Sequence, residues 1–306
     1  MARFEIDILG CGAAKPTLRH LPTAQVVNVR DKLFMIDCGE SAQISFCRSR
    51  LNMTRLGHIF ISHLHGDHCF GLFGMLSTMG LSGHTGEVVI HAHADAERLF
   101  RPMLDYFCRE SPFDIRFNSI SPNSSEAIYT DRSVTVRTIP LKHRIPTCGF
   151  LFEEAEGDRH LRGDMMDFYN IPIYCRSAIK QGENYITPEG KVIPNTILTL
   201  PPTPPARYAY CSDTMYSNRI IPYIEGVDVL YHEATYGDEA EALARQTHHC
   251  TARQAAQLAR EASVGQLVIG HFSSRYRDEN VLLAQAQEVF ANTTLAHECM
   301  KIVLRK

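Results

Sequence analysis

No uninterrupted apolar stretch in this chain of 306 residues approaches the roughly 20 residues that a membrane-spanning helix needs. The first nine residues alternate apolar and charged side chains, as a strand does, and lack the apolar block of a secretion signal. We therefore expect no membrane association. Hydrophobic residues make up 44% and charged residues 21% of the chain, a balance that excludes a disordered protein.

Closely spaced cysteines are also missing. The ten cysteines are scattered singly, and no C-x-x-C pair is present to form a zinc knuckle or a redox motif. Several lie inside apolar runs, including Cys11, Cys38 and Cys211, where they behave like small buried hydrophobic residues. This use of cysteine predicts a reduced, cytoplasmic protein. The formal net charge is only −3, so a polyanionic partner would need a local basic patch.

Strand-like runs of β-branched and aromatic residues recur along the chain. They are residues 4–9, 25–29, 32–36, 58–61, 88–91, 134–139, 149–152, 207–211, 227–231 and 266–269. Helical patterns alternate with the later runs. Thr251 and Gln254 form a capping box, followed by an apolar stripe of Ala255, Leu258, Ala259 and Ala262. A second helix is expected over residues 279–290. The pattern predicts an α/β fold, in which mixed sheets are covered by helices on the outside.

Residues 153–205 differ in composition from the rest of the chain. They mix charges, glycines and prolines and end in the run Leu-Pro-Pro-Thr-Pro-Pro at residues 200–205. Such a composition is typical of a loop or a protruding arm rather than of a core. No internal repeat and no further boundary is evident. We therefore expect a single domain, residues 1–306, with residues 153–205 as an inserted arm that contacts substrate.

The densest chemical feature is the run His-Leu-His-Gly-Asp-His at residues 63–68, with three imidazoles and one carboxylate in six residues. It follows a strand-like run, and the loops after strands are where α/β proteins assemble their sites. Histidine is the commonest neutral metal ligand. The alternative is a set of ordinary histidines, but burying so many polar groups without partners would be costly. Metal binding is the better interpretation.

Further ligand-capable residues follow four other predicted strands: His143, Asp213, the pair His232 and Glu233, and His271. These positions can converge on one rim of the sheets. The expected ligands are His63, His65 and His143 for one ion, Asp67, His68 and His271 for a second, and Asp213 as the bridge. Imidazole and carboxylate ligands suit Zn²⁺, with Mn²⁺ or Fe²⁺ as alternatives. Paired metals can lower the pKa of a shared water and stabilise an in-line displacement at phosphorus.

These motifs resemble the metallo-β-lactamase superfamily, and the fuller set resembles its short-form tRNase Z (ribonuclease Z) family. The resemblance rests on residues 9–12 (LGCG), 37–40 (DCGE), 62–68 (SHLHGDH), 143–147 (HRIPT), 212–214 (SDT), 232–235 (HEAT) and 271–276 (HFSSRY). It spans nearly the whole chain. The metal motif names only the superfamily, whereas the last two stretches are much more specific to the tRNA-processing family. The resemblance implies an αββα sandwich of the metallo-β-lactamase type with a protruding arm.

The resemblance also implies a function. It is that of a zinc-dependent endonuclease, a hydrolase that removes the 3′ trailer of precursor tRNA after the discriminator nucleotide. The tRNA would keep a 3′-hydroxyl and the trailer a 5′-phosphate. Asp67 would orient or deprotonate the attacking hydroxide, and Arg275 would help the metals to neutralise developing charge. His249 aligns with the family's general-acid histidine, held in register by Glu233, with His248 as the alternative. Two Zn²⁺ per subunit and a homodimer are implied as well.

Two departures from the family pattern concern contacts with the substrate. The usual Pro-x-Lys-x-Arg-Asn loop is replaced by Pro-Thr-Leu-Arg-His-Leu at residues 16–21, where Arg19 or His20 could supply part of the missing charge. The arm has no Gly-Pro-rich core, and Arg176 and Lys180 are its expected phosphate contacts. Ser273 and Arg275 are further expected substrate contacts. The range of substrates, including precursors that already contain CCA, stays open.

The sequence offers two alternatives to this function. A hydrolase of small phosphodiesters or other esters would keep the fold and change the substrate. A non-catalytic zinc-binding or RNA-binding protein is disfavoured, because all seven expected ligands and the candidate acid are present.

Expectations also follow for some of the remaining polar residues. Asp37 and Glu40 are expected to support loops near the site. We expect His91 and His93 to lie at the surface, and no cluster is expected around His58.

Overall fold

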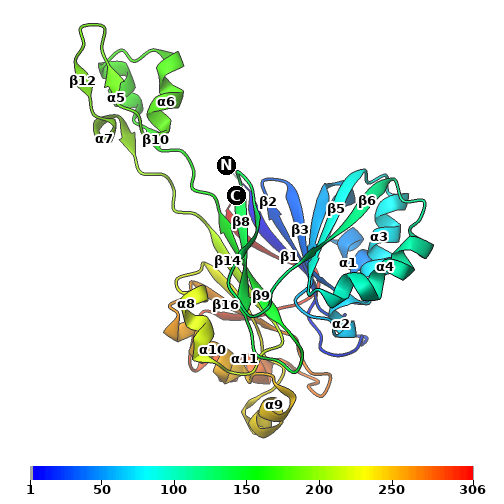
Figure 1. Cartoon of the computed structure of the whole chain (residues 1–306). Coiled ribbons are helices and arrows are strands. Elements are labelled where there is room, and N and C mark those ends of the chain that lie inside the picture. The colour runs from blue at the N-terminus through cyan, green and yellow to red at the C-terminus, as the bar shows by residue number, and fades with distance from the viewer. Residues whose placement is uncertain (1–2, 306) are drawn as a thin grey trace. The chain divides into compact units, whose positions relative to one another are not determined.

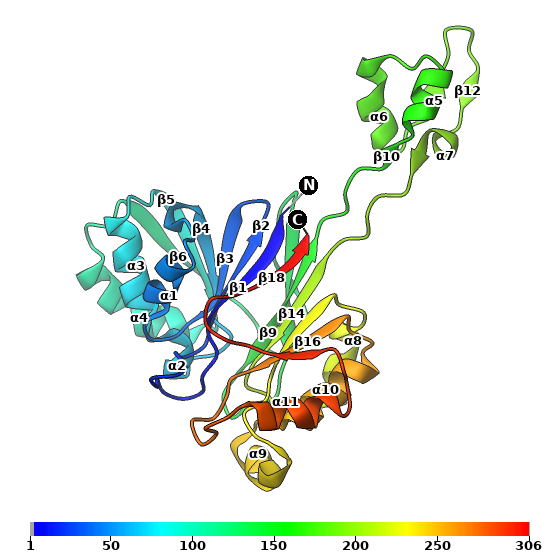
Figure 2. The same cartoon turned by 180° about the vertical axis from the view of Figure 1, so that it is seen from behind.

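The computed structural model describes residues 3–305, so residues 1, 2 and 306 of the predicted 1–306 domain lie outside the described part. The chain divides into two compact units. The first is built from the segments up to Glu153 and from Ala206 onward, and the second is Glu154–Pro205. Figure 1 colours the chain from its N-terminus to its C-terminus, and Figure 2 gives the opposite view.

The first unit contains two seven-stranded mixed sheets. The strand order of one sheet is β18-β1-β2-β3-β4-β5-β6 and that of the other is β17-β16-β15-β14-β9-β8-β7. The strands of the first sheet are β1 (Phe4–Gly10), β2 (Ala24–Val29), β3 (Lys32–Cys38), β4 (Leu56–Phe60), β5 (Gly86–Ala92), β6 (Phe113–Ser119) and β18 (Met300–Arg305). Those of the second are β7 (Ala127–Thr130), β8 (Val134–Pro140), β9 (Cys148–Glu154), β14 (Arg207–Cys211), β15 (Val229–Glu233), β16 (Gln266–Gly270) and β17 (Thr293–Leu295).

Alternating side chains on the strands explain why the two sheets stack. In β3, Phe34 and Ile36 join the core cluster that also holds Phe150, Phe152 and Tyr210 of the other sheet. The intervening residues Leu33 and Met35 belong to a separate core on the outer face. Because successive residues of a strand point to opposite faces, a strand that is buried throughout must be covered on both sides.

Helices supply the outer covers. Beside the first sheet, apolar residues of α1, α3 and α4 complete the outer core, and α10 and α11 pack with the second sheet. The helices of this unit are α1 (Ala42–Arg48), α2 (Gly66–Cys69), α3 (Leu72–Leu81), α4 (Asp95–Phe107), α8 (Ile221–Ile224), α9 (Glu241–Thr247), α10 (Ala252–Glu261) and α11 (Asn280–Gln287). Short 3₁₀ turns are η1 (Met53–Arg55), η3 (Asn218–Ile220) and η4 (Asp238–Ala240). The arrangement confirms the predicted αββα sandwich. No helix in residues 3–305 is long and apolar enough to cross a membrane.

The second unit has its own small core of Met166, Ile171, Ile179, Ile193 and Leu198. Its elements are β10 (His160–Leu161), α5 (Gly163–Phe168), η2 (Ile173–Cys175), α6 (Arg176–Lys180), β11 (Tyr185–Ile186), β12 (Val192–Ile193), α7 (Asn195–Leu198) and β13 (Thr199–Leu200). Strand β10 pairs with β13, and β11 pairs with β12. The sequence pattern did not predict these elements, because each is only two to six residues long.

Each of the ten predicted strand runs falls on an observed strand, with shifts at the ends. No end differs by more than two residues, and β15, which begins at Val229, is displaced by two residues at both ends. The capping box of α10 is confirmed, with Thr251 accepting from the backbone of Gln254 and the Gln254 side chain returning the bond. The predicted helix over residues 279–290 is observed as the shorter α11. Strands β6, β7, β17 and β18 were missed, because their charged or short sequences lack a clear alternation.

Candidate metal centre and active-site pocket

The predicted ligands gather at one place in the first unit. His63 and His68 follow β4, His143 follows β8, Asp213 follows β14 and His271 follows β16. Strands β14, β15 and β16 are parallel neighbours, so the loops after them leave the sheet at the same edge. This parallel order places residues that are far apart in sequence side by side.

One set of ligand atoms comprises Nε2 of His63, Nδ1 of His65, Nε2 of His143 and Oδ2 of Asp213. Nδ1 of His65 lies 3.0 Å from Nε2 of His63 and 3.3 Å from Nε2 of His143. Oδ2 of Asp213 lies 3.5 Å from Nε2 of His63 and 3.7 Å from Nε2 of His143. Atoms bound tetrahedrally to one Zn²⁺ at about 2.0–2.1 Å are about 3.3 Å apart, so these separations suit one ion.

A second set uses the other oxygen of the same aspartate. Oδ1 of Asp213 lies 3.2 Å from Nε2 of His68 and 3.0 Å from Nε2 of His271. Oδ2 of Asp67 lies 3.7 Å from the His68 nitrogen and 3.6 Å from the His271 nitrogen. Asp213 therefore presents one carboxylate oxygen to each set, as a bridging ligand would.

Buried polar atoms test whether these groups fit metals. Nε2 of His68 and Nε2 of His271 are buried and find no hydrogen-bond partner within residues 3–305, although Oδ1 of Asp213 is close to both. Such orphaned nitrogens are costly unless something else satisfies them. Burial lowers the pKa of His63 well below its usual value and that of His143 to about 4, which keeps both neutral. Imidazoles and carboxylates are a donor set that fits divalent metal ions.

Partners on the outward side of each ring fix which nitrogen faces the centre. Nδ1 of His68 is 2.7 Å from Oδ2 of Asp37, a buried carboxylate that also accepts from Ser62 and from the hydroxyl of Tyr210. Nδ1 of His143 donates to the carbonyl of His248 at 2.9 Å. Such contacts set the tautomer and orientation of metal-binding histidines. Asp37 thus does what was expected of it as a support near the site.

Beside the second set lies the pair of His249 and Glu233. Nδ1 of His249 is 2.8 Å from Oε1 of Glu233, which is fully buried. Although burial opposes it, the Glu233 carboxylate raises the pKa of His249 to about 9, so the imidazole is protonated at neutral pH. The Thr235 hydroxyl donates to Glu233 at 2.6 Å and lies 3.0 Å from Nδ1 of His271. Thr235 thereby connects this pair to the metal centre.

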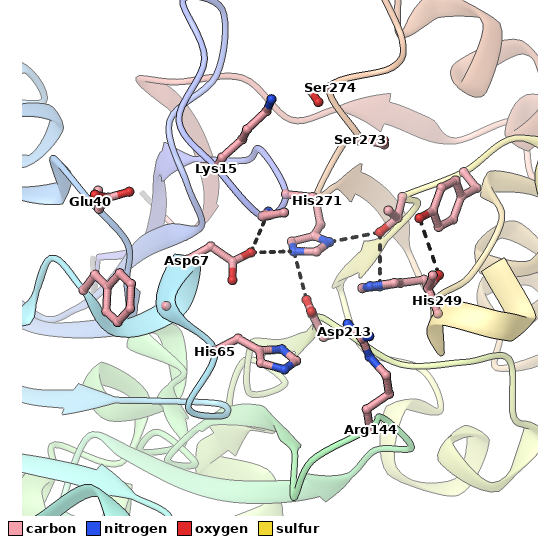
Figure 3. Close-up of a pocket in the computed structure, with 17 residues that line it drawn as sticks. Lys15, Glu40, His65, Asp67, Arg144, Asp213, His249, His271, Ser273 and Ser274 are labelled. Atoms are coloured by element: carbon pink, nitrogen blue, oxygen red, sulfur yellow. Dashed lines mark hydrogen bonds and ion pairs between the residues drawn. The ribbon is translucent and has the colours of Figure 1, made fainter. Parts of the chain in front are cut away.

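These groups face a pocket of about 530 Å³ (Figure 3). Besides His65, Asp67, Asp213, His249 and His271, it is lined by Ala13, Ala14, Lys15, Glu40, Gly66, Phe70, Arg144, Thr235, Tyr236, Thr247, Ser273 and Ser274. Two exposed cations, Lys15 and Arg144, lie on different sides of it in Figure 3. The sequence interpretation missed both, because neither belongs to a metal or acid pattern.

The loop that carries Lys15 is tied down on its far side. Nδ1 of His20 lies 3.1 Å from Glu298, and its Nε2 lies 3.4 Å from Glu279. Arg19 pairs with Glu279 at 3.0 Å and donates to the carbonyls of the 276–277 segment. These contacts argue against the expectation that Arg19 or His20 supplies charge to the substrate. Their charges are matched by carboxylates within the protein, and Lys15 is the cation that this loop presents to the pocket.

The other predicted substrate residues lie in different places. Ser273 lines the pocket, whereas the guanidinium of Arg275 lies 5.0 Å from the ring centre of Tyr236 and is not part of the lining. Arg176 and Lys180 belong to α6 of the second unit, where Arg176 is half-buried and Lys180 is exposed. His248 caps α9 in a left-handed conformation and does not line the pocket.

One expectation about the remaining histidines is wrong. His91 is buried, not exposed, and it contacts His58. Nε2 of His91 is 3.1 Å from Nδ1 of His58, and its Nδ1 is 2.9 Å from the amide nitrogen of Asn118. These side chains come from the neighbouring strands β4, β5 and β6, whose pairing the sequence alone did not reveal.

Comparison with known sequences gives matches over the whole chain. The chain is 56% identical to a protein of Phocaeicola vulgatus and 55% identical to one of Bacteroides fragilis, both named "Ribonuclease Z". Each alignment covers 99% of this chain, and it covers 98% of the first relative and 100% of the second. Residues 4–168 match the family described as "Anti-Pycsar protein Apyc1".

Comparison with solved structures supports the fold. The crystal structure of the short form of human tRNase Z superposes with a TM-score of 0.70 at 22% sequence identity, covering 99% of this chain and 100% of that one. A metallo-β-lactamase fold protein from Bacillus subtilis, YhfI, superposes with a TM-score of 0.69 at 17% sequence identity. The match covers 98% of this chain and 99% of that one. At these identities the likeness concerns the fold alone.

Proposed function

The chain belongs to the ribonuclease Z family, and from this premise we propose that it is the endoribonuclease that removes the 3′ trailer of precursor tRNA. The cut would follow the discriminator nucleotide and leave a 3′-hydroxyl on the tRNA and a 5′-phosphate on the trailer. The observation that carries the proposal is the pair of ligand sets joined through Asp213, with a protonated His249 beside them. This is a centre for hydrolysis of a phosphodiester.

We propose two Zn²⁺ per subunit, one in each ligand set, with Mn²⁺ or Fe²⁺ as alternatives. The ligands are His63, His65 and His143 for one site, Asp67, His68 and His271 for the other, and Asp213 for both. Bound there, the ions would lower the pKa of a shared water and stabilise negative charge at phosphorus. The donor types and the spacing of the ligand atoms support this assignment.

Asp67 orients the attacking water in this proposal. Its Oδ2 already accepts the backbone N–H of Ala14 at 2.7 Å, so the carboxylate is held in place. Although burial opposes it, His68 and His271 keep the pKa of Asp67 below its usual value, and the group stays ionised at neutral pH. An ionised carboxylate can only accept hydrogen bonds, so a water beside it points a proton toward it.

His249 protonates the departing 3′-oxygen. Nδ1 is engaged with Glu233, which leaves Nε2 as the nitrogen available to the substrate. A ring nitrogen of His249 also lies within 4.8 Å of the ligand atoms of Asp213 and His271, so the acid adjoins the reaction centre. His248 offers no comparable carboxylate contact among the described residues, which favours His249 as the acid.

Cations and hydroxyls would hold the RNA around this centre. Lys15 and Arg144, which line the pocket, would contact phosphates on either side of the scissile one, and Ser273 lines the same pocket. Arg275 would act from the rim, stacked on Tyr236. Arg176 and Lys180 of the second unit, the proposed arm, would contact phosphates farther along the tRNA. Phosphate contacts position a nucleic acid without reading its sequence.

We also propose a cytoplasmic homodimer. All ten cysteines are free, which supports a reducing compartment. The homodimer is supported by the resemblance to the family, and light scattering of the purified protein in solution tests it directly.

The test of function is incubation of zinc-loaded protein with a tRNA transcript that carries a trailer, followed by mapping of the new 3′ end. Cleavage beside the discriminator nucleotide is expected, with none by Asp67→Ala. Cleavage elsewhere, or full activity of the variant, would overturn the proposal.

Hydrolysis of small phosphodiesters is a second candidate, because every residue that lines the pocket belongs to the first unit. Deleting about residues 158–192 separates the two. Loss of tRNA cleavage with retained hydrolysis of small diesters supports the first function, and equal loss of both contradicts the proposed division of labour between the units.

A further inference from the structure

The aromatic ring of Phe70 stands beside the reaction centre and is open to solvent. Its side chain is 62% exposed, and it lines the same pocket as Asp67 and His271. A single exposed apolar side chain is ordinary on a protein surface. Here, however, the ring is set within a polar pocket, next to groups that the proposed function assigns to catalysis. An exposed aromatic face at such a place is a ready surface for a planar ligand.

The ring is held against the metal-binding segment itself. A Cβ atom at Gly66 would lie 2.3 Å from a carbon of the Phe70 ring, so the ring packs directly on this glycine. Gly66 lies between His65 and Asp67, which places the ring next to both proposed ligands. Any side chain at position 66 would displace the ring.

The backbone on either side of Phe70 is equally fixed. Its N–H donates to the carbonyl of Gly66 at 2.8 Å, and the N–H of Gly71 donates to the carbonyl of Cys38 at 2.8 Å. A Cβ at Gly71 would come within 2.0 Å of the carbonyl oxygen of Gly39, so the two segments are in close contact. The backbone that carries the ring is therefore held on both sides, and one edge of the ring packs on Gly66, so a ligand that stacks on it need order little of the protein.

Lys15 supplies the second element of this subsite. Its side chain is exposed, faces the same pocket and has no carboxylate partner within residues 3–305. Figure 3 shows it on the same side of the pocket as Asp67, with Arg144 on the other side. A planar apolar face and a free cation that line one pocket match a nucleotide, which joins a planar base to a phosphate.

We propose that Phe70 forms a nucleobase-binding subsite, on which the base of one of the two nucleotides flanking the scissile phosphate stacks. This inference rests on the proposed function and adds to it a residue that binds a base. Stacking does not distinguish strongly between bases, because every base has a π face. The subsite would thus favour RNA over phosphodiesters without a base, while accepting trailers of different sequence.

The experiment combines variants of Phe70 with precursors that lack one base. Cleavage rates are measured on a normal trailer-bearing tRNA and on two versions with an abasic nucleotide, one immediately before and one immediately after the cleaved bond. Wild-type protein should lose about tenfold in kcat/KM on one of the two abasic precursors, since a stacked base is worth about 1–3 kcal/mol. The kcat/KM of Phe70→Ala on the normal precursor should be about tenfold lower than that of the wild type. On the abasic precursor that impairs the wild type, the kcat/KM of Phe70→Ala should be no lower than on the normal precursor.

Two further substitutions separate stacking from a structural role. Phe70→Leu keeps an apolar side chain against Gly66 but removes the aromatic face, so it should behave like Phe70→Ala. Phe70→Trp should retain near wild-type cleavage. Phe107→Ala is the matched control, because Phe107 is a similarly exposed phenylalanine (65%) on α4, away from the pocket. Phe107→Ala should cleave the normal precursor at the wild-type rate. It should also show the same loss of kcat/KM on the abasic precursor as the wild type.

The outcomes distinguish this inference from the proposed function. If wild-type protein cuts the trailer correctly but neither abasic precursor is impaired, the function stands and the subsite is wrong. The same holds if the abasic penalty persists undiminished in Phe70→Ala or Phe70→Leu. If wild-type protein fails to cut the normal precursor, the proposed function itself fails.

Discussion

At the scale of single residues, the site is a set of side chains whose neighbours decide what they can do. Two adjacent histidines illustrate this. His249 contacts the buried carboxylate of Glu233, whereas His248 contributes its backbone carbonyl to His143. The same residue type therefore provides the proposed proton donor at one position and a backbone contact at the next, and their surroundings make the difference.

Replacing His249 by Ala should slow single-turnover cleavage of precursor tRNA by about 10²–10⁴-fold, because a general acid contributes that much. A substrate with sulfur in place of the leaving 3′-oxygen needs no protonation and should be cleaved at nearly the wild-type rate. His248→Gly is the control, since glycine tolerates the positive φ of 60° and keeps the carbonyl. Equal loss on both substrates would contradict the acid role.

Asp37 offers a test of how the ligands are oriented. Asp37→Asn should weaken zinc binding by about 10–100-fold, because its carboxylate accepts from the outward nitrogen of His68. Asparagine tolerates the positive φ of 55° at this position, so the backbone should be kept. Competition with a chelator of known affinity measures the change. Asp7→Asn, a buried carboxylate paired with Lys301 instead, should leave zinc affinity unaltered.

At the scale of elements, local patterns predicted the strands well, but pairing decided what their side chains meet. The alternation in β4 and β5 is visible in the sequence. That His58 and His91 touch follows from the parallel register of these strands, in which His91 pairs with Phe60. Similarly, the loop at residues 16–21 looks like a source of positive charge until the carboxylates of Glu279 and Glu298 are found against it. A local pattern cannot contain such partners, because they come from more than 250 positions away.

The buried His91 and the half-buried His58 predict a pH dependence of stability. Burial lowers the pKa of His91 to about 3 and that of His58 to about 4, below the value of about 6.5 in an unfolded chain. At a pH between the folded and unfolded pKa values, the unfolded state binds more protons than the folded state. The free energy of unfolding is therefore highest above pH 6.5 and decreases as the pH falls. His91 alone should lower the free energy of unfolding by about 2 kcal/mol between pH 7 and pH 5.

Urea denaturation of the chelator-treated protein at both pH values measures this loss. His91→Gln should show a smaller fall than the wild type. His297→Gln, at an exposed histidine, should show the wild-type fall. If the free energy of unfolding fell by the same amount in all three proteins between pH 7 and pH 5, His91 would not be a source of the pH dependence.

At the scale of the whole molecule, the metal centre draws on distant parts of the first unit. Its proposed ligands lie between residues 63 and 271 and follow strands of both sheets. A metal bound there links these loops in the folded chain but not in the unfolded one, and ligands that bind only the folded state stabilise it. The second unit has a separate core and contains none of these ligands.

Removing the metal should therefore lower the melting temperature of the first unit. Free zinc at 100 times its Kd stabilises the folded state by about 2.7 kcal/mol. This stabilisation corresponds to an increase of several degrees in the melting temperature. Calorimetry with and without chelator should show the shift in the intact chain and also after deletion of about residues 158–192. A melting temperature that did not respond to zinc would contradict the proposed sites.

The sequence by itself determined the donor atoms, the strands that precede them and the family, because these are encoded in short runs and in the types of residue. Only the tertiary structure decided which oxygen of Asp213 serves which ligand set, which of Lys15, Arg19 and His20 faces the pocket, and that the ring of Phe70 is open beside Gly66. The physical reason is that strand order and packing bring together residues that are far apart in the sequence. A local sequence pattern does not show which of these residues are in contact.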